Sequence, residues 1–353
     1  MKKLIAVLLC LAMVFAFAGC DNGENAVTIN VYNWGEYIDD EVMDVNAEFT
    51  KRTGIKVNYK TFENNETMYT LLSNGGADYD VVCPSDYMMG KMIHEGMMKK
   101  LNFDNIPNYK YIGDEYKNLA YDPKNEYSVP YTWGTVGIFY NSNYVSEEDV
   151  KQNWDILWNK KYEGKILMFD NPRDAFAIAL QKLGYSLNTT NENEWSKAYD
   201  LLEEQKPLVL QYVNDQVYDL MINEEAWIAP YYAGDANIMI YDEAGNENIK
   251  FYIPESGTNF FVDCWGVLAN SKHPNEAEQY INFLCETEVA KANAEYIGYS
   301  TPHVEARKVL DPEVGENPYF YPSKAIMDKT EMFLPLDDKT NKLQADLWLK
   351  LRQ

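Results

Sequence analysis

Along the first third of the chain, segments with the apolar spacing of a β-strand alternate with segments that have the apolar spacing of a helix. Short apolar or alternating runs predict β-strands, and apolar residues three or four positions apart predict helices that bury one face. Gly54 and Gly96 follow two of the helical segments, where glycine commonly ends a helix. The pattern predicts strands over residues 27–32, 55–59 and 79–83, and helices over residues 39–52, 66–73 and 87–94.

The same alternation continues through the rest of the chain. The pattern predicts strands over residues 165–169, 208–212, 226–231 and 260–268, helices over residues 172–183, 195–204, 215–223 and 342–351, and further helices after Pro274. Strands joined through helices favour an α/β fold with a parallel sheet. A mature chain of about 330 residues exceeds a comfortable single core, so we expect two lobes.

The first twenty residues have the features of an export signal. A basic start precedes an apolar run over residues 4–17, which is shorter than the roughly 20 residues that cross a bilayer. The small residues ending in Cys20 resemble the lipobox of bacterial lipoproteins, in which the cysteine is acylated. We therefore predict a signal peptide over residues 1–19, a lipidated tether over residues 20–26, and attachment to the outer face of the cell membrane. Phe17 stands where that family usually has leucine, so cleavage without acylation, or an ordinary thiol, is the alternative.

The chain is strongly acidic, with 55 Asp and Glu against 31 Lys and Arg and a formal charge of −24. Cleavage of the signal removes Lys2 and Lys3 and lowers this charge to −26. Such a surface repels nucleic acid and attracts cations, although solubility explains the charge equally well. Beyond the signal lie three cysteines in no paired or metal-like spacing, which we expect to be buried: Cys83, Cys264 and Cys285.

Aromatic and acidic residues gather where the predicted strands end. Ligands of open α/β sheets bind at the carboxyl ends of strands, so these residues are candidates for a site. They are Trp34, Glu36 and Tyr37; Tyr87; Asp174; and Tyr232 and Asp235, while Phe261 and Asp263 lie on the long predicted strand itself. Carboxylates among ring faces suit an alkylammonium ligand, because they offer charge-assisted hydrogen bonds, cation–π contacts and apolar contact for methylenes.

Each candidate also has a structural interpretation. Glu36, Asp174 and Asp235 stand near predicted helix starts and could cap them, and Asp86 fits a cap better than a ligand contact. The aromatic candidates could belong to the core. Asp263 is the most informative residue, because an acid within the apolar strand 260–268 needs a partner.

Several segments in a fixed order resemble the spermidine/putrescine-binding proteins of polyamine ABC importers. They are residues 32–37 (Tyr-Asn-Trp-Gly-Glu-Tyr), 65–69 (Asn-Glu-Thr-Met-Tyr), 79–85, 129–134, 182–186 (Lys-Leu-Gly-Tyr-Ser), 282–284, 297–302 and Arg307. The resemblance covers nearly the whole mature chain. It implies a type II periplasmic-binding-protein fold, with two α/β lobes and a ligand cleft that closes on the ligand.

The resemblance also implies lobe boundaries and site residues. One lobe would comprise residues 27–133 and 263–305, and the other residues 134–262 and 306–353. One wall of the cleft would carry Trp34, Glu36, Tyr37, Ser85 and Tyr87, and the other Asp174, Tyr232, Phe261 and Asp263, with Tyr299 nearby. The chain shares features with both branches of the family, so the length of the ligand stays open. Asn171 and Tyr232 replace an acid and a tryptophan of spermidine-type members, Asp235 resembles the putrescine type, and Glu36 resembles the spermidine type.

The resulting hypothesis is an extracellular solute-binding protein that captures a polyamine and delivers it to ABC permeases driven by a separate ATPase. We expect no cofactor, no metal, no nucleic-acid partner and no catalysis. A ligand-presenting sensory receptor with the same cleft is one alternative. A lipid-anchored hydrolase is another, but the sequence has no Gly-x-Ser-x-Gly or His-Glu-x-x-His motif and only three histidines.

Overall fold

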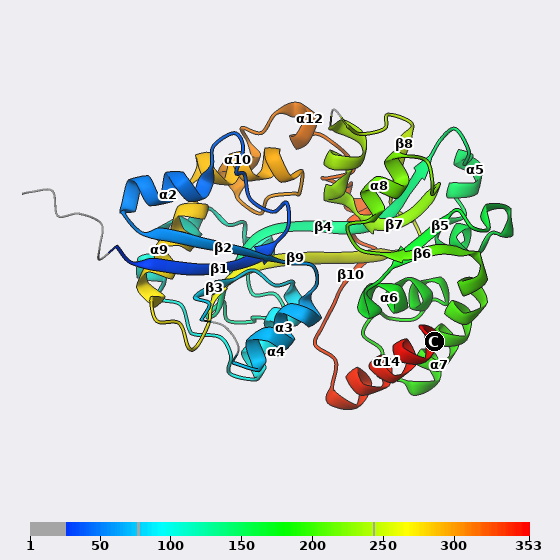
Figure 1. Ribbon diagram of the computed structural model, residues 1–353, viewed down its shortest axis with the longest axis horizontal. Coiled ribbons are helices and arrows are strands. Elements are labelled where there is room, and N and C mark those ends of the chain that lie inside the picture. Colours follow the sequence, from blue (N-terminus) through cyan, green and yellow to red (C-terminus); the bar gives the residue numbers. More distant parts are fainter. Residues whose placement is uncertain (1–25, 76–77, 243) are drawn as a thin grey trace, which may run out of the picture.

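Two lobes of α/β architecture share one continuous sheet in the computed structural model, which describes residues 26–75, 78–242 and 244–353 (Figure 1). The predicted signal peptide and Cys20 lie outside the described residues. The strands are β1 (Thr28–Trp34), β2 (Lys56–Phe62), β3 (Val81–Val82), β4 (Ser128–Asn141), β5 (Ile166–Phe169), β6 (Val209–Val213), β7 (Ile228–Tyr232), β8 (Ile249–Tyr252), β9 (Thr258–Val267) and β10 (Thr330–Met332). The α-helices are α2 (Val45–Thr53), α3 (Asn65–Ser73), α4 (Asp86–His94), α5 (Glu147–Val150), α6 (Pro172–Lys182), α7 (Glu192–Gln205), α8 (Val217–Ile222), α9 (Pro274–Leu284), α10 (Thr287–Ile297), α11 (Val304–Arg307), α12 (Pro312–Gly315), α13 (Lys324–Met327) and α14 (Asp338–Leu351).

The sheet is mixed rather than parallel. Its strand order is β2-β1-β3-β9-β4-β7-β5-β6, with β10 beside β9 and β8 beside β4. Within each lobe the expected parallel pairs occur: β1 pairs with β2 and β3, and β5 pairs with β6 and β7. The expectation of a parallel sheet is wrong at the centre, where β4 and β9 run antiparallel to each other, β9 runs antiparallel to β3, and β4 runs antiparallel to β7 and β8. The short β10 pairs with β9 in parallel.

The long strands β4 and β9 connect the two lobes (Figure 1). Residues 128–135 of β4 pair with β9, whereas residues 136–141 pair with β7 and β8 in the second lobe. The register between β4 and β9 shifts at residues 130–132. The first lobe holds β1–β3 with α2–α4, α9 and α10, and the second holds β5–β8 with α5–α8 and α14 (Figure 1).

The residues before α2 depart from the sequence prediction. We expected a helix from residue 39, but α2 begins at Val45 and Val42 is 86% exposed. The cause is local: the Asp39 carboxylate accepts the backbone N–H groups of residues 41, 42 and 43, which holds this segment in a turn. Asp44 then caps α2 by accepting the N–H of Ala47.

Each lobe buries its own core. In the second lobe, aromatic side chains such as Trp154, Phe176 and Trp195 pack between the sheet and its helices. In the first lobe, alternate residues of each strand face opposite sides of the sheet, so Trp265 joins one cluster and Val262 joins another. Cys83, Cys264 and Cys285 are buried free thiols, as expected. No helix of the described residues is long and apolar enough to span a membrane.

Candidate functional site

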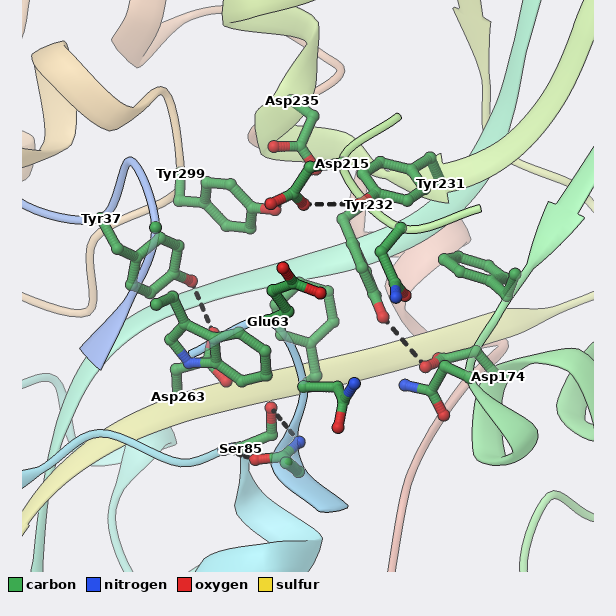
Figure 2. Close-up of a pocket in the computed structure, with 18 of the residues that line it drawn as sticks. Tyr37, Glu63, Ser85, Asp174, Asp215, Tyr231, Tyr232, Asp235, Asp263 and Tyr299 are labelled. Atoms are coloured by element: carbon green, nitrogen blue, oxygen red, sulfur yellow. Dashed lines mark hydrogen bonds between the residues drawn. The ribbon is translucent and has the colours of Figure 1, made fainter. Parts of the chain in front are cut away.

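A cavity opens between the lobes, beside the β4 and β9 crossing (Figure 2). All eleven residues that the sequence nominated for ligand contact line this cavity: Trp34, Glu36, Tyr37, Ser85, Tyr87, Asp174, Tyr232, Asp235, Phe261, Asp263 and Tyr299. They come from separate segments of the chain. The fold therefore brings together side chains that are up to 265 positions apart, from Trp34 to Tyr299.

The end of β1 contributes three of these side chains through a tight turn. Glu36 has a φ of 47°, a left-handed conformation that few non-glycine residues adopt. The turn leaves Glu36 exposed at the rim, whereas Tyr37 points inward and is 6% exposed. Trp34 packs against Phe62 with ring centroids 4.5 Å apart. Its indole N–H is buried and has no hydrogen-bond partner among the described residues.

Asp263 lies in the middle of β9, on the same face as Phe261 and Trp265, and is 4% exposed. Its Oδ2 accepts a hydrogen bond of 2.5 Å from the hydroxyl of Tyr37, and its Oδ1 is buried without a partner in the described part of the chain. Burial raises the pKa of Asp263 to about 6. An unpartnered carboxylate oxygen at the wall of a cavity is ready to accept a hydrogen bond from a cationic ligand.

Asp235 is held between two tyrosines. Its carboxylate accepts hydrogen bonds from the hydroxyls of Tyr299, at 2.9 Å, and Tyr218, at 3.1 Å. Burial raises the pKa of Asp235 to about 7. The preceding Gly234 makes this arrangement possible, because a Cβ at that position would stand 2.0 Å from the Tyr299 ring.

Asp174 belongs to the first turn of α6 and faces the cavity from the second lobe (Figure 2). It accepts a hydrogen bond of 2.9 Å from the Tyr232 hydroxyl, and burial raises its pKa to about 7. Tyr232 in turn packs edge-on against Phe261. Asn171 caps α6 by accepting the N–H of Arg173.

Ser85 and Tyr87 belong to a hydrogen-bonded cluster at the start of α4. Asn65 donates to the hydroxyls of both residues, and Tyr87 donates to Glu66. The neighbouring Asp86 is fully buried and accepts the backbone N–H groups of Tyr87 and Val262. Asp86 therefore ties α4 to β9. It was expected to cap a helix, but it is the first residue of α4, and the cap position is Ser85.

Two acids at the cavity were missed from the sequence, namely Glu63 and Asp215. Glu63 directly follows β2, and Asp215 follows β6 by two residues. The rule that ligand residues lie at the carboxyl ends of strands applies to both. We had expected Asp215 to begin a helix, whereas α8 begins at Val217 and leaves Asp215 in the preceding loop.

The cavity wall combines many carboxylates with many rings and has no cationic side chain among the described residues. Its acids are Glu36, Glu63, Asp86, Asp174, Asp215, Asp235 and Asp263. A buried cation nearby is Arg173, which donates to Asn188 and to the carbonyl of Leu334 and lies over the Phe333 ring rather than in the cavity. The described residues contain no group of three side chains suited to a metal ion. A ligand that matches this wall carries several positive charges along an apolar frame.

Comparison with known proteins places this architecture in a family. Residues 79–330, more than half of the chain, match the family of bacterial extracellular solute-binding proteins. The chain belongs to that family. A spermidine/putrescine-binding periplasmic protein of Escherichia coli (strain K12) is 38% identical over 321 residues, which cover 90% of this chain and 88% of the relative.

Solved structures of other solute-binding proteins resemble this one in three dimensions. A putative spermidine/putrescine ABC transporter structure from Listeria monocytogenes superposes with a TM-score of 0.87 at 34% identity, covering 93% of this chain and 99% of that one. The spermidine/putrescine substrate-binding protein of Streptococcus pneumoniae gives a TM-score of 0.79 at 35% identity, with the same coverage. Residues 1–118 also match a family described as a hypothetical lipoprotein. The expectation of a two-lobed periplasmic-binding-protein fold is thus confirmed.

Proposed function

We propose that this solute-binding protein captures a linear polyamine in the cavity between its lobes and delivers it to the permeases of an ABC importer. The observation that carries the proposal is the pairing of buried acids with tyrosines. Asp174, Asp235 and Asp263 are each at most 6% exposed, and each is held by a tyrosine hydroxyl. The names of the family relatives support the same ligand class.

Tyrosine hydroxyls suit this task better than lysine or arginine would. A hydroxyl fixes the orientation of a carboxylate without neutralising its charge, so the acid keeps its attraction for an ammonium group. The rings of Tyr37, Tyr232 and Tyr299 meanwhile offer faces and edges to the methylene groups between the nitrogens. The cavity therefore offers partners both for the ammonium groups and for the methylene groups of an alkylammonium ligand.

The assignment of roles follows the depth of each acid. Asp263 is proposed as the principal ammonium anchor, because its Oδ1 is buried and unpaired among the described residues. Asp174 and Asp235 hold the ligand on the side of the second lobe, and Trp34 covers methylene groups from the first lobe. Glu36 receives a nitrogen near the rim, where its side chain is exposed.

Two further parts of the proposal concern the whole molecule. The lobes are assigned to residues 27–133 with 263–305 and to residues 134–262 with 306–353, and they close on the ligand by bending at β4 and β9. Cys20 is assigned a lipid anchor that keeps the mature protein at the outer face of the membrane, near its permeases. The apolar run before Cys20 and the match to a lipoprotein family over residues 1–118 support the anchor.

Isothermal titration calorimetry tests the proposed ligand class. The mature protein is titrated with putrescine, spermidine, an amino acid and a sugar. We expect heat of binding with one or both amines and none with the two controls. Binding of the sugar or the amino acid alone would contradict the proposal.

A further inference from the structure

Residues 333–337, which we call the strap, join β10 to α14 and are anchored to the second lobe by polar groups (Figure 1). Asn188, in the loop between α6 and α7, donates to the carbonyl of Met332, and its Oδ1 accepts the backbone N–H of Leu334 at 2.7 Å. Arg173, in the first turn of α6, donates to the carbonyl of Leu334 at 3.0 Å. These hydrogen bonds make the strap part of the second lobe.

The strap touches the first lobe through apolar groups. Phe333 forms a small cluster with Ala177 and Leu187 of the second lobe, and Tyr87 of α4 packs against this cluster. The rings of Tyr87 and Phe333 meet edge-on, with centroids 5.8 Å apart. The contact leaves Phe333 only 3% exposed. Two elements that belong to different lobes therefore share one apolar contact.

Gly90 provides a second contact between the strap and α4. It lies three residues after Tyr87, so both residues are on the same face of the helix. A Cβ at Gly90 would stand 2.9 Å from Cγ of Pro335, closer than the roughly 3.5 to 4.0 Å at which carbon atoms pack. The absence of a side chain at Gly90 thus lets the strap lie against α4. Neither Gly90 nor Pro335 lines the ligand cavity.

Opening of the cleft would separate these surfaces, because the strap moves with the second lobe and α4 moves with the first. Apolar surface that closure removes from water favours the closed form. The carboxylates around the cavity act in the opposite direction, because like charges repel each other as the lobes approach. The contact between the strap and α4 therefore offsets part of the repulsion between the cavity walls.

We propose that the contact of the strap with α4 is an apolar latch between the lobes, in which Gly90 and Pro335 are positioning residues that raise the affinity for a ligand they do not touch. The inference rests on the proposed capture of a polyamine and on closure of the lobes. A latch that forms only in the closed state adds its free energy to the binding of any ligand that closes the cleft. It slows release more than capture, because the ligand leaves only after the latch has opened.

Gly90→Ala tests the latch by placing a methyl group against Pro335. Alanine favours a helix over glycine, so α4 should remain folded. We expect the affinities for putrescine and spermidine, measured by calorimetry, to fall by the same factor of about three to ten, as for mild overpacking. Stopped-flow fluorescence should show that the loss lies in faster dissociation. The new Cβ would also stand 3.3 Å from Cβ of Tyr121 within the first lobe, so a second variant is needed.

Pro335→Ala separates the two contacts, because it removes the Cγ atom that the methyl group meets. Alone it should lower amine affinity by less than about threefold. Combined with Gly90→Ala, it should restore the affinity to within about twofold of Pro335→Ala alone, because the methyl group then has room. Gly315→Ala is the matched control: its Cβ would stand 3.3 Å from Cβ of Leu310, and Gly315 lies in α12 outside the cavity. Its amine affinity should stay within about twofold of the parent.

Three outcomes would overturn the latch while leaving polyamine capture intact. The first is an affinity of Gly90→Ala within about twofold of the parent. The second is a loss that Pro335→Ala does not relieve, because the methyl group would then act through Tyr121. The third is an unequal loss for the two amines, which would indicate that Tyr87 has moved within the cavity. Failure of the unmodified protein to bind any amine would instead overturn the proposed function.

Discussion

The hydroxyl of Tyr37 lies 2.5 Å from Oδ2 of Asp263 and so joins the turn after β1 to the middle of β9. The same hydroxyl lies 2.7 Å from Oγ1 of Thr132 on β4, so it contacts both of the strands that connect the lobes. The backbone carbonyl of Tyr37 in turn accepts a hydrogen bond from Tyr131. The orientation of the Asp263 carboxylate is thereby set before any ligand arrives.

Replacing Asp263 tests its role as the principal anchor. Asp263→Asn keeps the shape and removes the charge, so polyamine affinity should fall by about 10- to 150-fold if a charge-assisted hydrogen bond contributes about 1.5 to 3 kcal/mol. Trp34→Ala should cost about tenfold, because cation–π and methylene contacts contribute about 1 to 2 kcal/mol when desolvated. Calorimetry on folded variants measures both. An Asp263→Asn protein that binds within about threefold of the parent would make Asp263 a structural acid.

The buried acids predict opposite effects of pH on ligand binding and on stability. Burial raises the pKa of Asp174 and Asp235 to about 7 and that of Asp263 to about 6. Only their charged forms attract an ammonium group, so polyamine affinity, measured by calorimetry, should rise between about pH 5 and pH 8.

In the ligand-free protein the same acids bind protons more tightly than they do in the unfolded chain. Their contribution to the free energy of unfolding is therefore fully present below the ordinary pKa of 3.8 and is lost progressively as the pH rises from there through the folded-state values of about 6 to 7. Chemical denaturation across this range measures it. Asp235→Asn should flatten the dependence, and an equally steep profile in that variant would assign the effect to other groups.

Gly234 tests the packing that positions Asp235. In Gly234→Ala the new Cβ would stand 2.0 Å from the Tyr299 ring, so the ring must move away and its hydrogen bond to Asp235 is lost. Overpacking of this kind costs about 1 to 3 kcal/mol of stability. Thermal unfolding and calorimetry should show lower stability together with weaker amine binding.

A second glycine provides the control for lost stability alone. Gly164 has a φ of 72°, so Gly164→Ala also strains the backbone. No atom lies within 4 Å of the position that its Cβ would take, and Gly164 does not line the cavity. Amine binding should therefore be unchanged in this variant. If amine binding were unchanged in Gly234→Ala as well, Tyr299 would have no role in binding the ligand.

The connection of the lobes through β4 and β9 predicts closure on the ligand. Small-angle scattering should show a smaller radius of gyration with saturating polyamine than without it, and no change with a sugar. Ligand at a hundredfold excess over Kd should also stabilise the protein by about 2.7 kcal/mol. Stabilisation without compaction would indicate a cavity that fills but does not close.

The anchor at Cys20 predicts a modified amino terminus. Mass spectrometry of the mature protein should find a chain that begins at Cys20 and carries lipid. Cys20→Ala should release the protein from the membrane fraction, whereas Cys10→Ala, within the export signal, should not. A free terminus at another residue would contradict the anchor.

The sequence predicted the cleft more completely than it predicted the sheet around it. Asp263 could be recognised because a charge within an apolar strand breaks a pattern, and the aromatic and acidic residues after strands followed a general rule. Strand β4 carried no such signal, because Pro130, Gly134 and Gly137 interrupt its apolar pattern. The antiparallel pairing of β4 and β9 depends on contacts between residues more than 100 positions apart, which no local pattern encodes.

Glu63 and Asp215 show a different limit of sequence reasoning. Both follow predicted strands, but acids are so frequent in this chain that their identity alone carries little information. What distinguishes them is that both line the cavity, one from each lobe, and this depends on the placement of the lobes. Helix boundaries were also displaced by side chains, as at Asp39, where a carboxylate replaces the first helical turn as the partner of three N–H groups.

The burial of Cys83, Cys264 and Cys285 makes this protein a convenient starting point for an optical sensor. A cysteine introduced on the cavity rim, as in Asn214→Cys, would be the single reactive thiol among the described residues. An environment-sensitive dye attached there would lie in the cavity between the lobes, and its emission should change on the lobe closure predicted above. The protein could then report amine concentrations in solution without a radioactive ligand or a coupled enzyme.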